Sequence, residues 1–296
     1  MKKRICIKTV ISIMIFASIA LLFSAFYSTC VSNTKSPEVI QGYLDLSDWD
    51  FAKGKIAFLN GQWAFYPEQL LNPEELSEET AHFIKVPGSW KRQGGEYIQA
   101  ARGVGTYHLS LKLPELQGPF AIKIQNIWMA HRLYINGELV KEAGIPADCL
   151  ENDLPENTPY LATIDHGGEV DLVIEVSNHV FYTGGISHPI LIGGKQSMEK
   201  RDKLGFAGDM AEFFVFLLFG IYHLHMYQMR DKEPTYLYSG IFFVARSITI
   251  VTMGEKLLMQ VADRLPFEAA YKILEFFLLW SIIALIFLYN PWSQES

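Results

Sequence analysis

Three long apolar segments in the last third of this 296-residue chain limit what it can fold into. They cover residues 206–227, 236–253 and 270–289. An α-helix needs about 20 apolar residues to cross a hydrocarbon core about 30 Å thick, and each segment is close to that length. We therefore expect a membrane protein in which residues 206–296 form a partial transmembrane helical domain, after a linker at residues 196–205.

The distribution of charge predicts how these helices cross the membrane. The link at residues 228–235 carries Arg230 and Lys232, so the positive-inside rule places it in the cytoplasm. The first helix then runs from outside to inside, and everything between the N-terminal segment and residue 206 lies outside the cell or in the periplasm. The expected location is the cell membrane, with several passes.

The first 32 residues have the composition of an export signal. Lys2, Lys3 and Arg4 precede an apolar core of about 14 residues, which suits a signal peptide and is short for a full span. Residues 1–32 are therefore either a cleaved signal peptide or an uncleaved signal anchor. Both alternatives leave the following residues outside.

Residues 33–195 are predicted to form an all-β domain. Apolar and polar residues alternate along 104–113, 120–124 and 170–176, as expected for half-buried strands. Within these patterns Tyr107 is expected in the core, as are Trp63 and Phe65.

Turn signals support the same fold. Asn-Gly pairs at residues 60–61 and 136–137 predict β-hairpins, because Asn-Gly supplies the positive φ angles of a type I′ turn. A short helix is expected only within 67–80. Many short strands separated by turns indicate a β-sandwich or jelly roll, followed by the transmembrane helices.

Three ionisable residues fall within the predicted spans. At 1.5 Å per residue, Glu212 and Glu275 lie roughly 8 Å below the outer surface and Arg246 roughly 11–12 Å below it. Since an unpaired charge in lipid is costly, we expect Arg246 to pair with Glu212 or Glu275. In the alternative, both carboxylates reach the headgroups, and Arg246 meets backbone carbonyls or water.

A series of short motifs resembles a known family in its order along the chain. The motifs are Leu46-Ser47-Asp48-Trp49, Leu59-Asn60-Gly61-Gln62-Trp63, Val86-Pro87-Gly88-Ser89-Trp90, Gly105-Thr106-Tyr107, Arg132-Leu133-Tyr134-Ile135-Asn136-Gly137, Ser177-Asn178, Gly184-Gly185-Ile186, Phe219-Gly220-Ile221-Tyr222-His223, Tyr236-Leu237-Tyr238-Ser239-Gly240 and Gly254-Glu255. Together they resemble bacterial seven-transmembrane receptors with diverse intracellular signalling modules, which carry an exterior galactose-binding-like jelly roll.

The resemblance implies a receptor that senses an extracellular ligand, a carbohydrate or a carboxylate, and passes the signal through its helices. The chain departs from this family because it contains three spans after the exterior domain and no output module. We therefore expect a fragment or partial receptor that needs a partner, either a second copy or a separate signalling chain. The alternative is a membrane-tethered carbohydrate-binding or surface protein without signalling.

An enzymatic function is not expected. The β-domain motifs also resemble the sugar-binding domain of family 2 glycoside hydrolases, but their catalytic residues lie in a separate barrel, for which this chain has no room. The sequence lacks a serine nucleophile elbow, a phosphate-binding glycine loop and an HExxH motif. It also has no Cys/His metal cluster, and its net charge of -7 argues against nucleic-acid binding. No cofactor or metal is expected.

Trp90, Arg102 and Arg132 are the candidate ligand-binding residues. In jelly rolls of this type the site lies on loops at one end, where an aromatic face stacks on a sugar and an Arg binds hydroxyls or carboxylates. Each residue also has a structural alternative. Trp90 can plug the end of the barrel, Arg132 can be a solvated strand residue, and Arg102 can be a loop charge.

Overall fold

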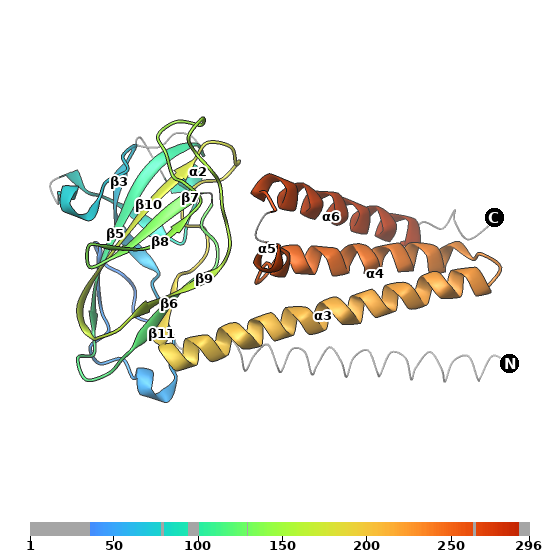
Figure 1. Cartoon of the computed structure of the whole chain (residues 1–296), viewed down its shortest axis with the longest axis horizontal. Helices are drawn as coiled ribbons and strands as arrows, with labels where there is room; N and C mark the ends of the chain where they lie inside the picture. Colours follow the sequence, from blue (N-terminus) through green and yellow to red (C-terminus); the bar gives the residue numbers. More distant parts are fainter. Residues whose placement is uncertain (1–35, 78–79, 94–100, 129, 263–264, 290–296) are drawn as a thin grey trace. The chain divides into compact units, whose positions relative to one another are not determined.

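The computed structural model describes residues 36–77, 80–93, 101–128, 130–262 and 265–289 (Figure 1). Two β-sheets in the first part of this range are followed by helices in the last part. The predicted signal segment, residues 1–32, lies outside the described residues. A β-sandwich followed by helices agrees with the coarse prediction from the sequence.

The larger sheet has seven strands in the order β4-β3-β5-β10-β7-β8, with β1 beside β5. These strands are β1 (Tyr43–Asp45), β3 (Gly61–Pro67), β4 (His82–Val86), β5 (Gly103–Leu113), β7 (Ala130–Ile135), β8 (Glu138–Ala143) and β10 (Gly168–Asn178). The smaller sheet has the order β2-β11-β6-β9, formed by β2 (Ala57–Phe58), β6 (Phe120–Ile124), β9 (Tyr160–Ile164) and β11 (Leu191–Gly194). The named strand pairs are antiparallel, apart from the parallel pair of β1 and β5.

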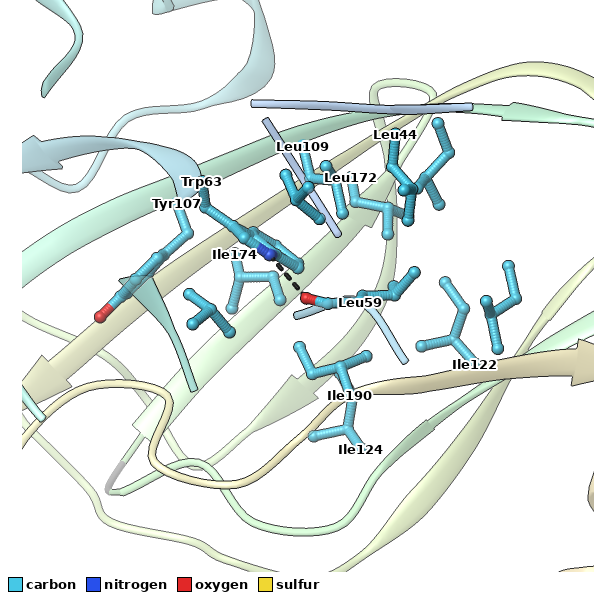
Figure 2. Packing of buried hydrophobic residues seen from close by; sticks show 14 of the residues in the cluster. Leu44, Leu59, Trp63, Tyr107, Leu109, Ile122, Ile124, Leu172, Ile174 and Ile190 are labelled. Carbon is cyan, nitrogen blue, oxygen red and sulfur yellow. Dashed lines mark hydrogen bonds between the residues drawn. The ribbon is translucent and has the colours of Figure 1, made fainter. Parts of the chain in front are cut away.

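The core lies between the two sheets and follows the predicted alternation. Leu109 on β5 is opposite Leu172 on β10, and both are fully buried, whereas Lys112 on the other face is exposed. Ile122 and Ile124 of the smaller sheet face this layer (Figure 2). Because every second residue enters the core, the period-two pattern correctly located β5, β6 and β10.

The two Asn-Gly pairs behave differently. Asn136 and Gly137 have φ angles of 51° and 84° and join β7 to β8, so this predicted hairpin is confirmed. The hairpin predicted at residues 60–61 is wrong, because β2 and β3 belong to different sheets. Here the chain crosses from one side of the core to the other.

Packing of an upstream segment explains the crossing at Gly61. A Cβ at Gly61 would collide with the backbone of Val39, whose carbonyl accepts a hydrogen bond from Gln62 N–H at 2.9 Å. Glycine is needed for this close approach. Its φ of 138° is a second reason, because residues with a side chain rarely adopt such an angle. The buried indole of Trp63 then donates its N–H to the carbonyl of Leu59 at 2.9 Å (Figure 2).

Short helices occupy three connections of the sandwich. They are η1 (Phe51–Lys53), η2 (Pro73–Glu75) and α2 (Trp90–Gln93). Of the helix expected within residues 67–80, the described part contains only the single turn η2. There the Glu75 carboxylate accepts a hydrogen bond from Asn72 N–H at 2.9 Å, which caps the turn.

The last part of the chain forms α3 (Lys195–Met229), α4 (Pro234–Thr252), α5 (Leu257–Val261) and α6 (Phe267–Tyr289). By length and composition, α3, α4 and α6 can each cross a membrane. The structure differs from the predicted linker, because residues 196–205 form the first turns of α3. This stretch contains no proline and only one glycine, so nothing in it interrupts the helix.

Helix α4 packs against both of its long neighbours (Figure 1). On one side, a Cβ at Gly220 of α3 would lie 2.6 Å from Val244 Cγ2, and a Cβ at Gly240 would lie 2.7 Å from Leu224. The glycines therefore permit close approach of α3 and α4, as small residues do between membrane helices. On the other side, Tyr238 stacks on Phe287 of α6 with ring centroids 5.2 Å apart.

Replacing Trp63 with Phe should lower the free energy of unfolding by about 1–3 kcal/mol, since the buried Leu59 carbonyl would lose its donor. Unfolding in detergent, followed by fluorescence or circular dichroism, measures the loss. Trp49→Phe is the matched control, because the buried Nε1 of Trp49 has no hydrogen-bond partner among the residues that the structure describes. Equal losses in the two variants would contradict the role given to the Trp63 hydrogen bond.

Candidate functional site

Trp90 lies in the core of the sandwich. Its side chain is 0% exposed, and its indole N–H donates to the Tyr107 hydroxyl at 2.6 Å. The backbone of Gly184 packs directly against the ring, where a Cβ would collide with it. In this conformation the indole has no surface for stacking on a sugar, so the structure favours the packing role. Contact between Trp90 and a ligand stays a prediction that would require these loops to move.

Arg132 lies on β7 between carboxylates from both neighbouring strands. Its Nε contacts Glu142 of β8 at 2.7 Å, and its Nη1 contacts Glu175 of β10 at 2.9 Å. Glu175 is only 2% exposed, and burial raises its pKa, an effect that the Arg132 guanidinium opposes. The Arg132 guanidinium therefore compensates a buried carboxylate. The sequence suggested instead that it binds a ligand or is a solvated strand residue.

Arg102 is exposed beside the start of β5. Of the three candidate residues, it is the one that is exposed and makes no ion pair within 4.0 Å in the described part of the chain. No hydrogen bond, ion pair or ring contact among the described residues joins Trp90, Arg102 and Arg132 to one another. Ligand binding by Arg102 remains a prediction.

A different polar cluster lies where the smaller sheet meets the helices. Lys123 of β6 is 6% exposed, and its ammonium group contacts the carboxylate of Asp202 on α3. The same ammonium group contacts Glu255 Oε2, just after α4, at 2.7 Å. Two carboxylates, one on α3 and one in the turn after α4, therefore compensate the charge of one buried cation of the β-sandwich.

The turn after α4 is held in place by α3. The Glu255 N–H donates to Asp209 Oδ2 at 2.8 Å. Gly254 has a φ of 58°, and a Cβ there would collide with the Asp209 carboxylate. The glycine thus lets the turn approach α3 and direct the Glu255 side chain toward Lys123.

Lys256, the next residue, inserts its side chain into the β-sandwich. It is 8% exposed and donates to the Asn157 carbonyl at 2.6 Å and to Asn126 Oδ1 at 3.4 Å. Its ammonium group also lies 5.3 Å from the ring centre of Trp128. Burial lowers the pKa of Lys256 to about 7, because desolvation disfavours the charged form. Lys123, Asp202, Asp209, Glu255 and Lys256 are hereafter called the junction.

An aromatic cluster contacts α6 beside the junction. Trp128 stacks on Phe181 with centroids 4.3 Å apart, and both rings come from loops of the β-sandwich. Tyr271 of α6 meets Phe181 edge to face at 5.1 Å, and Phe267 meets Trp128 edge to face at 6.1 Å. Side chains from α3, the turn after α4, and α6 thus all contact the β-sandwich.

The three ionisable residues predicted to lie within the spans form no ion pair with one another among the described residues. Arg246 makes no ion pair within 4.0 Å in the part of the chain that the structure describes, although it interacts electrostatically with Glu212. Glu275 is exposed on α6 and interacts with Tyr271, one turn earlier. Pairing of Arg246 with Glu212 stays a prediction, and the described contacts do not join Arg246 to Glu275.

Sequence reasoning missed the junction. Gly254-Glu255 is one of the motifs in the family resemblance, but nothing in the sequence indicates that Lys123 reaches a residue 132 positions later. Among the described residues, no group of three or more His, Cys, Asp or Glu side chains is placed to hold a metal ion.

No protein-family model matches the sequence, and the search of curated proteins found no match. Solved structures match about half of the chain. One is a β-glucuronidase from an uncultured Clostridium species, with a TM-score of 0.37 and 18% identity, covering 48% of this chain and 29% of that chain.

Two further structures are similar to the same extent. A family 2 β-galacturonidase from Eisenbergiella tayi, bound to galacturonate, has a TM-score of 0.34 and 16% identity over 47% of this chain and 24% of its own. A β-glucuronidase from Faecalibacterium prausnitzii has a TM-score of 0.36 and 14% identity over 47% and 31%. This chain therefore spans less than a third of these enzymes, and likeness at this level assigns it neither an activity nor a ligand.

Replacing Arg132 with Met should lower the free energy of unfolding at pH 7 by about 2–4 kcal/mol, because Glu175 would be left buried without its cation. The pKa of Glu175 should then rise further. Since the unfolded chain titrates near the ordinary pKa of Glu, about 4.3, the loss should grow from pH 5 to pH 7.

Thermal unfolding in detergent at the two pH values measures this effect. Glu142→Gln is the control, since Glu142 is 41% exposed and its pairing with Arg132 should contribute about 1 kcal/mol or less. A pH-independent loss in the Arg132 variant would contradict the assignment.

Proposed function

We propose that this protein is the sensing part of a bacterial membrane receptor. Its β-sandwich, of the galactose-binding-like jelly-roll type, lies outside and binds a carbohydrate or carboxylate, and α3, α4 and α6 carry the resulting change across the membrane. The proposed role is binding rather than catalysis. A second copy or a separate signalling chain would receive the signal.

The buried ion pairs of Lys123 are the observation that carries this proposal. A β-domain that is only tethered needs a single covalent connection to its anchor. Here one strand residue is bound by carboxylates from α3 and from the turn after α4, and its own ammonium group is almost inaccessible to water. Separating the two parts would leave a buried ammonium group without a counter-ion, which is costly, so displacement of β6 should move both helical segments.

The covalent connection supports the same interpretation. Strand β11 pairs with β2 up to Ile192 and with β6 up to Gly194, and Lys195 immediately begins α3. The Lys195 N–H donates to the Pro119 carbonyl at 2.9 Å, which fixes the start of the helix against the chain entering β6. Because no flexible segment separates the smaller sheet from α3, a shift of this sheet should displace the start of the helix.

Binding to the full chain in lipid nanodiscs tests the proposal. D-Galactose, D-glucuronate and succinate, at millimolar concentrations, represent a neutral sugar, a sugar acid and a simple carboxylate. We expect at least one to raise the unfolding temperature and to change hydrogen exchange both in the sandwich and in residues 195–209 and 253–262. Binding without a change in hydrogen exchange in those helical residues would favour the tethered carbohydrate-binding alternative. If none of the three compounds binds, the proposed ligand classes are contradicted.

Lys123→Met should uncouple the two parts. The variant should still bind the probe that the wild type binds, within about threefold, because Lys123 lies at the helices and not at the exposed loops of the sandwich. The exchange changes in residues 195–209 and 253–262 should be lost, since the cation shared by Asp202 and Glu255 is gone. Lys112→Met, at an exposed position of β5, is the matched control, and equal behaviour of the two variants would contradict the relay.

A further inference from the structure

A short loop at one end of the sandwich exposes apolar side chains. In the connection between β10 and β11, Val180 is 42% exposed and Tyr182 is 72% exposed, whereas Phe181 between them is buried. Residues 176–194 contain no Asp, Glu, Lys or Arg, although these four types make up 19% of the chain. Single exposed apolar residues are common on protein surfaces, so what they indicate here depends on the place of this loop in the fold.

The side chain of Asn178 holds the loop in a defined shape. Asn178 is fully buried, and its Nδ2 donates to the carbonyls of Phe181 and Thr183, each at 3.1 Å. Its Oδ1 accepts a hydrogen bond from the Phe181 N–H at 2.9 Å. Internal partners for these backbone groups lower the cost of moving the loop toward a layer that contains little water.

Ring contacts fix the loop against the first turns of α6. Phe181 meets Tyr271 of α6 edge to face, with ring centroids 5.1 Å apart. The ring of Tyr182 lies 4.3 Å from that of Phe181. Tyr182 is thus one ring removed from Tyr271, so the depth of Tyr271 determines where the loop lies relative to a membrane.

The lengths of α4 and α6 give this depth. From Tyr271 to Tyr289, at the end of α6, the rise is about 27 Å, and the whole of α4 rises about 28 Å. The two helices are aligned at both ends, since Tyr238 stacks on Phe287 and since Thr252 and Tyr271 line the same small cavity. A hydrocarbon core about 30 Å thick therefore ends close to Thr252 and Tyr271.

We propose that the loop at residues 179–183 inserts into the outer leaflet of the membrane. Val180 and Tyr182 lie in the interfacial layer, which is about 5–8 Å thick on each side of the hydrocarbon core. A Tyr side chain suits this layer because its ring is apolar and its hydroxyl is polar. The inference rests on the proposed membrane position of α6, and it gives the sandwich a contact with lipid that its covalent connection to α3 does not provide.

The surroundings of the loop favour lipid over a protein partner. His179 Nε2 lies 2.8 Å from the carbonyl of Ala147, in the neighbouring loop at residues 144–157. That loop exposes Leu150, but it also exposes Asp148 and Glu151, whose charges interrupt the apolar surface. A stable protein interface needs about 800 Å² from each partner, far more than two side chains supply, whereas insertion into lipid needs only a tip.

The opposite end of the sandwich offers a matched control. Strands β5 and β10 are antiparallel, and Asn178 is opposite Gly103 at one end while Gly168 is opposite Leu113 at the other. Strands of this length place the two ends about 33 Å apart. Leu116, in the loop that follows β5, is fully exposed, so it is an apolar side chain that should stay in water.

The test measures quenching of a nitrobenzoxadiazole label on the full chain in nanodiscs. The three native cysteines are replaced by Ser, and one cysteine is introduced at a time. Tyr182→Cys reports on the loop, Leu116→Cys on the opposite end, and Ile282→Cys on an exposed position of α6. The two quenchers are phosphatidylcholine with a nitroxide on the fifth acyl carbon and aqueous iodide.

The lipid nitroxide should quench the label at position 182 at least roughly twofold more than the label at position 116, and iodide should show the reverse order. The label at position 282 should be quenched by the nitroxide. If it is, and position 182 behaves like position 116, insertion is overturned while the membrane position of α6 stands. If position 282 is not quenched, the proposed membrane position fails as well. Shielding of position 182 from both quenchers would reveal a protein partner and contradict lipid contact.

The wild-type chain provides a second test that does not depend on the folding of Tyr182→Cys. A phospholipid with a photoreactive diazirine on its acyl chain is crosslinked in nanodiscs, and the modified residues are identified by mass spectrometry. We expect crosslinks in α6 and in residues 179–183, and none in residues 114–118. Crosslinks in α6 without any in residues 179–183 would contradict insertion of the loop.

Discussion

Compensation of a buried ammonium group is the interaction on which the connection between sandwich and helices depends. Lys123 projects from the smaller sheet, is almost inaccessible to water, and is contacted by Asp202 and by Glu255. Removing ions from water costs several kcal/mol each, so this arrangement is stable only while the partners stay together. The position of α3 and the turn after α4 relative to β6 is therefore set by charge as well as by shape.

Lys256, one residue after Glu255, provides the contrast. It is buried to a similar degree, yet it is held by a carbonyl, a long contact to an amide and an aromatic ring. The first lysine has its counter-ions within the chain, and the second has none within ion-pair distance among the described residues. The turn after α4 thus combines a fixed contact with an incompletely satisfied one. Because burial lowers the pKa of Lys256 to about 7, its contact with the sandwich can respond to pH.

Local sequence patterns predicted the elements in which buried and exposed positions alternate or in which apolar residues form a long run. Alternation located β5, β6 and β10, and hydropathy located α3, α4 and α6. Local patterns failed where a distant segment decides the structure. The Asn60-Gly61 pair looked like a hairpin, but Val39 packs against Gly61 and the chain changes sheets. Residues 196–205, predicted as a linker, form the first turns of α3.

The candidate site was less predictable for the same reason. The chemistry of Arg132 suggested ligand binding, but its partners on β8 and β10 depend on the strand register, which local sequence patterns do not reveal. Lys123 occupies a normally polar position of an alternating strand, and its partners lie 79 and 132 residues further along the chain. A double-mutant cycle of Lys123→Met and Glu255→Gln, followed by thermal unfolding of the full chain in nanodiscs, tests the central claim most directly. Our account predicts a coupling free energy of about 1–3 kcal/mol between the two positions, and additive effects of the two substitutions would contradict it.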